Sequence, residues 1–174
     1  MFHPTVFDNI KVTLENQLYD YDNLDGLLVI TDRSDLLDLA LMSREFSLAF
    51  KLTGGRHVTA GIVLRSTVKE LGDEILETPG GQPGCTLTLR FDMEISDVKV
   101  QCAAVEEILT TIWGPELRPV QTLRFRYGAV EPVYQNGVEL HFRRLLTEDQ
   151  MEDLPGLLNY LLQSTEELEK LFNL

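Results

Sequence analysis

Four basic side chains in the last third of the sequence are the strongest candidates for a functional site. Arg124 and Arg126 alternate along one predicted strand, and His141 and Arg143 alternate along another, so each pair shares one strand face. If the two strands are sheet neighbours with these faces aligned, three guanidiniums and an imidazole converge. Because the arginine fork matches carboxylate and phosphate oxygens, this cluster predicts a site for an anionic ligand or an acidic partner.

The charge distribution makes this cluster stand out. The 174-residue chain has a net charge of −13, but segment 117–144 carries five arginines against two glutamates and is therefore net positive by three. Such an acidic molecule repels nucleic acid over most of its surface, so general nucleic-acid binding is not expected. The competing interpretation of the cluster is that its arginines pair with the protein's own surplus carboxylates.

Sequence motifs for common catalytic chemistry are missing. There is no G-x-S-x-G nucleophile elbow, and the glycine-rich segment 80–84 lacks the lysine of a phosphate-binding loop. The three histidines are far apart and show no local metal-ligand spacing. Cys85 and Cys102 are not in a C-x-x-C pair, which favours two small core hydrophobes over a disulfide or a reactive thiol. We predict no metal and no cofactor, and we favour a protein that is not an enzyme.

Segment 46–64 predicts a β-hairpin. Apolar residues alternate on both arms, and the two apolar sets face one core only if Phe46 lies opposite Leu64 and Phe50 opposite Ala60. This register predicts a three-residue turn at 54–56. A helix should follow, because Thr67 and Glu70 have capping-box spacing and an apolar side begins at Val68. The β-β-α unit is the expected folding nucleus.

Two segments in the N-terminal part are ambiguous. Segment 7–21 alternates well enough for a strand, which we favour, but Phe7, Ile10, Leu14 and Leu18 also have helical spacing. Residues 27–31 suit a buried strand. Segment 35–42 is either continuous with the next strand through a bulge or a short helix capped by Ser34.

The rest of the chain has clearer patterns. Strict alternation over 85–95 predicts a strand with one buried face, and 103–112 predicts a helix that ends at Gly114. Asn136-Gly137 predicts a hairpin turn between extended runs at 129–135 and 138–145. The last helix begins with a second capping-box spacing and has an apolar side, which predicts docking on the domain or pairing in a homodimer.

Together these patterns predict a single globular domain over residues 1–174 with an α+β fold. We expect a mostly antiparallel sheet of about six or seven strands, with two or three helices packed mainly on one face. No membrane segment and no secretory leader are expected, so the predicted location is the cytoplasm. The favoured function is a non-enzymatic binding or accessory protein that meets a protein partner or a second copy through a sheet face or an exposed helix. The alternative is a small-molecule enzyme or anionic-ligand-binding protein with its site at Arg124, Arg126, His141 and Arg143.

Overall fold

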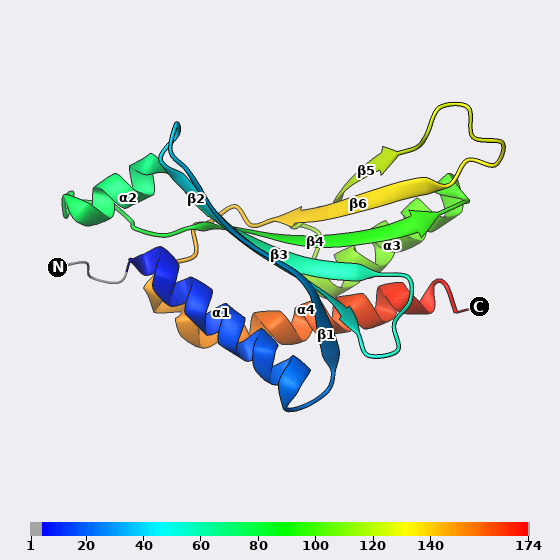
Figure 1. The fold of residues 1–174 in the computed structure, drawn as a ribbon, viewed down its shortest axis with the longest axis horizontal. Coiled ribbons are helices and arrows are strands. Elements are labelled where there is room, and N and C mark those ends of the chain that lie inside the picture. Colours follow the sequence, from blue (N-terminus) through cyan, green and yellow to red (C-terminus); the bar gives the residue numbers. More distant parts are fainter. Residues whose placement is uncertain (1–4, 174) are drawn as a thin grey trace.

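Six antiparallel strands and four α-helices make up the fold in the computed structural model, which describes residues 5–173 (Figure 1). The strands are β1 (Leu28–Asp38), β2 (Ser43–Leu52), β3 (Thr59–Ser66), β4 (Thr86–Ile95), β5 (Val120–Arg124) and β6 (Tyr134–His141). The helices are α1 (Val6–Asn23), α2 (Val68–Ile75), α3 (Val98–Trp113), the short 3-10 helix η1 (Glu148–Asp153) and α4 (Leu154–Lys170). The strand order is β1-β2-β3-β4-β6-β5, which confirms the predicted α+β class.

Three helices cover one face of the sheet and leave the other face open. Figure 1 shows α1, α3 and α4 on the same side, while α2 projects beyond one end of the sheet. The clearest alternation is in β4, where every second residue from Leu87 to Ile95 is buried and the intervening ones face outward. These buried side chains join those of the three helices in one hydrophobic core.

The β2–β3 hairpin has the predicted register. Phe46 lies opposite Leu64 and Phe50 opposite Ala60, and all four side chains are buried. The predicted three-residue turn is wrong, because the connection between the strands is longer and spans residues 53–58. Its geometry depends on α4: the carboxylate of Glu169 accepts hydrogen bonds from the N–H groups of residues 56, 57 and 58 at 2.7, 2.9 and 2.9 Å.

The favoured strand over 7–21 is also wrong, since this segment is helix α1. Phe7, Ile10, Leu14 and Leu18 form its buried side, at helical spacing. The alternating residue Val12, which a strand would have buried, is 48% exposed. Both patterns are present in the sequence, and packing against the sheet decides between them.

Neither interpretation of segment 35–42 is correct. Strand β1 runs on to Asp38, and a turn over 39–42 returns the chain into β2, with Met42 at a positive φ of 53°. The register shift in this hairpin lies earlier, between Ile30 and Asp32. Residues 27–31 are strand only from Leu28, which is the one residue of β1 that is fully buried.

The predicted Asn136-Gly137 hairpin turn is also wrong. Both residues lie inside β6, which pairs with β4 on one side and β5 on the other. Asn136 faces the core, where its Nδ2 donates to Gln121 Oε1 at 2.9 Å. The turn signal fails because the alternation continues through this pair, and segment 125–133 makes the connection instead.

The remaining helix predictions are confirmed. Both capping boxes are present, one at α2 and one at η1, and Pro155 lies in the first turn of α4, where the chain restarts as an α-helix. The leucines of α4 are buried against the sheet, so this helix docks on the rest of the chain. Within residues 5–173, no helix is long and apolar enough to span a membrane. The expectation of no leader concerns residues 1–4, which lie outside the described range.

An ionic network joins α1 to the β1–β2 hairpin. Arg44 bridges Asp8, at 2.5 Å, and Asp35, at 3.1 Å, and Lys11 lies 2.7 Å from Asp35. Burial opposes ionisation of Asp35, but its hydrogen bonds from Arg44 and Lys11 outweigh burial and hold its pKa below the ordinary value. The pKa of Asp8 is lowered in the same way, against burial, by hydrogen bonds from Thr5 and Arg44.

These lowered pKa values predict an acid-sensitive contribution to stability. A carboxyl group whose pKa is lower in the folded state stabilises that state above its unfolded pKa of about 4, and this stabilisation is lost as the pH falls. We expect Asp35→Asn to lower the free energy of unfolding at neutral pH by about 1 kcal/mol, as partly exposed ion pairs do. Urea unfolding should show this deficit shrinking below about pH 4. Asp25→Asn, in an exposed turn, is the control, and an equal deficit at both pH values contradicts the assignment.

Candidate functional site

The structure divides the four predicted site residues into two pairs. Arg124 ends β5 opposite Gln135 at the start of β6, whereas His141 is the last residue of β6. Six residues of extended chain, about 20 Å, separate these two positions along the strand. Arg126 follows Arg124 into the 125–133 loop, and Arg143 follows His141 at the far end. The expected convergence of all four side chains is therefore not what the sheet register produces.

The arginines of segment 117–144 are not neutralised by the protein's own acids. Six other cations form salt bridges, but within the described residues none of the five arginines of this segment does; they are Arg118, Arg124, Arg126, Arg143 and Arg144. All five are exposed. The interpretation that they serve internal ion pairs is therefore not supported in this part of the chain.

His141 takes part in a polar chain on the open face of the sheet. Its Nδ1 lies 3.2 Å from the hydroxyl of Thr88, and its Nε2 lies 2.9 Å from a carboxylate oxygen of Glu139. This hydroxyl–imidazole–carboxylate order resembles that of a nucleophilic site. The His141 side chain is 54% exposed, however, so the three groups lie in water and not in the enclosed pocket that such chemistry uses. No group of three His, Cys, Asp or Glu side chains placed to hold a metal occurs between residues 5 and 173.

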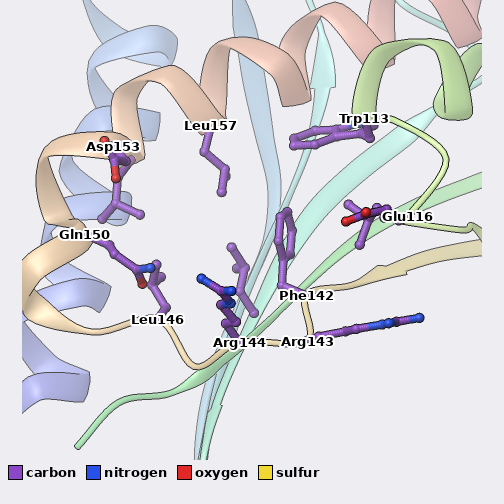
Figure 2. A pocket seen from close by; sticks show the side chains of 12 residues that line it. Trp113, Glu116, Phe142, Arg143, Arg144, Leu146, Gln150, Asp153 and Leu157 are labelled. Atoms are coloured by element: carbon purple, nitrogen blue, oxygen red, sulfur yellow. The ribbon is translucent and has the colours of Figure 1, made fainter. Parts of the chain in front are cut away.

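Arg143 and Arg144 lie beside an apolar hollow between the end of β6 and helices α3 and α4. The hollow has a volume of about 640 Å³, within the range of small-molecule sites. Its apolar lining consists of Leu87, Trp113, Leu117, Phe142, Leu146, Leu154 and Leu157. Figure 2 shows the guanidinium of Arg144 between Gln150 and Phe142, whereas Arg143 extends away from the other labelled side chains.

Hydrogen bonding and aromatic contacts hold the walls of this hollow in place. The indole N–H of Trp113 donates to the hydroxyl of Ser164 on α4 at 2.8 Å. Phe142 meets the Trp113 ring edge-on, with centroids 5.8 Å apart and an interplanar angle of 83°. A second ring, Tyr160, lies 5.6 Å from Trp113. Because the rings are fixed by these contacts, the hollow is preformed.

A second feature is an apolar surface beyond the end of the sheet where β2 begins and β3 ends, which is also the end where β6 finishes. It consists of the exposed large hydrophobic side chains of the β1–β2 turn region and of α2 with its C-cap, and we call it the apolar end surface. Its members are Leu36, Leu37, Leu39, Leu41, Met42, Val68, Ile75 and Leu76, which are between 50% and 76% exposed. Figure 1 shows the hairpin tip and α2 leaving the same end of the molecule.

Helix α2 differs from the sequence-based prediction in its packing. Its position and capping box are as predicted, but none of its residues is buried, so its apolar side does not contribute to a folding nucleus. The helix is tied to the body mainly through its chain connection to β3 and through Glu74, which accepts a hydrogen bond from the N–H of Val6 at 2.9 Å. The sequence did contain a sign that α2 would not be buried. The helix has only eight residues before the Pro-Gly-Gly segment, and so short a helix can cover little of a sheet.

Both cysteines are free thiols in the structure. Burial, with a smaller contribution from the charge of Glu70, raises the pKa of Cys85 to about 12. Burial also raises the pKa of Cys102, which is partly exposed. Neither thiol has the low pKa of a nucleophilic cysteine; Cys85 is a core residue as predicted, whereas Cys102 is only partly buried and packs against the core.

Comparisons with protein-family models, with curated proteins and with solved structures found no match to this chain. The functional argument therefore depends on the hollow, on the unpaired arginines and on the apolar end surface.

The environment of Cys85 predicts that it does not react in the folded state. Thiol reagents attack the thiolate, which is almost absent at about pH 8 when the pKa is near 12. In a Cys102→Ser variant, we expect Ellman's reagent to leave Cys85 unmodified until urea unfolds the protein. The Cys85→Ser variant reports Cys102 alone, which should react faster because it is partly exposed. Fast modification of Cys85 in the native protein contradicts the assigned burial.

Proposed function

We propose that this protein is a non-enzymatic cytoplasmic accessory protein that binds a basic, amphipathic segment of another protein on its apolar end surface. The observation that carries the proposal is helix α2, which is amphipathic and has no buried residue. An eight-residue helix is marginal in water unless its apolar side packs against something. A partner that covers Ile75 and Leu76, each 76% exposed, supplies that packing.

The size of the surface suits a protein partner. A large aliphatic side chain carries about 60–120 Å² of apolar surface, so eight side chains that are half to three-quarters exposed present roughly 300–600 Å². This area is divided between the two faces of the hairpin, across which Leu36 and Leu37 alternate, and α2, so a partner covers it by wrapping this end of the molecule. A standard interface buries about 800 Å² per partner, so this surface fits the apolar core of such an interface with room for a polar rim.

Charge favours a foreign, basic partner over a second copy. Segment 67–78 carries Lys69 against four acids, a net charge of −3, and segment 32–45 carries two arginines against four acids, a net charge of −2. Self-association through this surface would therefore bring a net −5 against another −5. A segment with leucine-like residues on one side and lysine or arginine on the other complements both the apolar side chains and the acids.

The proposal predicts charge-selective peptide binding that depends on α2. The probe is a labelled amphipathic helical peptide of leucine and lysine, compared with the same peptide in which glutamate replaces lysine. Fluorescence anisotropy should show binding of the basic peptide only, weakened by added salt. The double variant Ile75→Gln/Leu76→Gln should bind at least about tenfold more weakly, since each buried aliphatic side chain contributes about 1.5–3 kcal/mol.

Matched controls place glutamine at exposed apolar positions of other helices. Val12→Gln in α1 and Val100→Gln in α3 should bind as the wild type does, and all variants should keep the wild-type melting temperature because none of these side chains is buried. Equal peptide binding by the Ile75→Gln/Leu76→Gln variant contradicts the proposal. So does a stable dimer in sedimentation that this double variant abolishes, because a second copy would then be the occupant.

A further inference from the structure

The hollow beside Arg144 lies between the sheet and helices α3 and α4, near the same end of the sheet as the apolar end surface, but it has a different character. Its volume of about 640 Å³ is that of a small-molecule site, and its floor is formed by side chains from β4, α4 and the segment after β6. Leu157 and Phe142 point toward the same space in Figure 2, with Trp113 closing one side. This shape accommodates one apolar group of modest size.

The aromatic wall is already organised in the free protein. The Trp113 ring is fixed by its hydrogen bond to Ser164 and by its edge-on contact with Phe142. A ligand that packs against these rings therefore avoids much of the cost of ordering them.

The charged groups at the hollow specify the other part of the ligand. The Arg144 side chain is exposed, lies within the hollow and forms no salt bridge within residues 5–173, in a protein whose net charge is −13. Glu116 and Asp153 also line the hollow, and neither pairs with Arg144. Two carboxylates nearby disfavour a phosphate or another multiply charged anion, whereas a single carboxylate can still meet the guanidinium fork.

We propose that this hollow binds a small organic acid that consists of an apolar, preferably aromatic, body and one carboxylate. The body packs among Leu157, Phe142 and Trp113, and the carboxylate accepts hydrogen bonds from Arg144. This site is independent of the proposed peptide-binding surface, so either can fail without the other.

The test uses 3-phenylpropionate as the probe and the fluorescence of Trp113, the only tryptophan in the chain, as the readout. The wild-type protein should give a saturable fluorescence change, with calorimetry as a second measurement. Because hydrogen bonds to charged groups are the strong ones, Arg144→Ala should weaken binding about tenfold or more, and Arg144→Glu should abolish it. Arg144→Lys should restore the charge but only part of the affinity, because lysine lacks the planar fork.

Matched probes and variants separate this assignment from general stickiness. Arg124→Ala removes another exposed, unpaired arginine at the far end of β6 and should bind as the wild type does. Leu157→Gln should weaken binding through the apolar body while leaving the charge in place. The amine 3-phenylpropylamine and inorganic phosphate should not compete. No saturable binding by the wild type, unchanged binding by both Arg144→Ala and Arg144→Glu, or equal binding of the amine overturns the proposal.

Discussion

The fold depends on the burial of only one face of its sheet. Strands β2, β3, β4 and β6 contribute buried side chains to a single core, and α1, α3 and α4 close that core from one side. This constraint explains the position of the charged network as well. Arg44 and Asp35 lie near the edge of the sheet, on the side that faces the helices and where the apolar core ends. There they form ion pairs with Asp8 and Lys11 on the polar side of α1.

The same constraint separates what the sequence could predict from what it could not. The register of the β2–β3 hairpin follows from alternation, because a slip of one residue would turn Phe46 and Phe50 away from the core. The 53–58 connection does not follow from local pattern, since its shape is set by Glu169, more than one hundred residues away. In α1, helical and alternating patterns coexist, and only packing of the helix on the sheet selects the helical one.

The sequence pointed to the arginines of the candidate site but not to their arrangement. Charge reversal in an acidic chain drew attention to segment 117–144, whose arginines form no salt bridge within residues 5–173. Their separation into two groups could not be predicted, because it depends on which residue of β5 pairs with which residue of β6, and the Asn136-Gly137 signal suggested a turn in the middle of that strand. Arg144 is a candidate because it lines the same hollow as Trp113 and Leu157. These residues belong to helices distant from it in the sequence, so only the folded structure shows that they lie together.

The central functional claim is that α2 presents an apolar side that no other part of residues 5–173 buries. Hydrogen–deuterium exchange of the α2 amides in dilute protein tests it most directly, because local stability follows buried contacts. We predict fast exchange over Val68–Ile75, slow exchange in β3 and β4, and a selective slowing in α2 when the basic amphipathic peptide is added. Protection of α2 as strong as that of α1 in the isolated, dilute protein, with no change on addition of the peptide, would contradict the account.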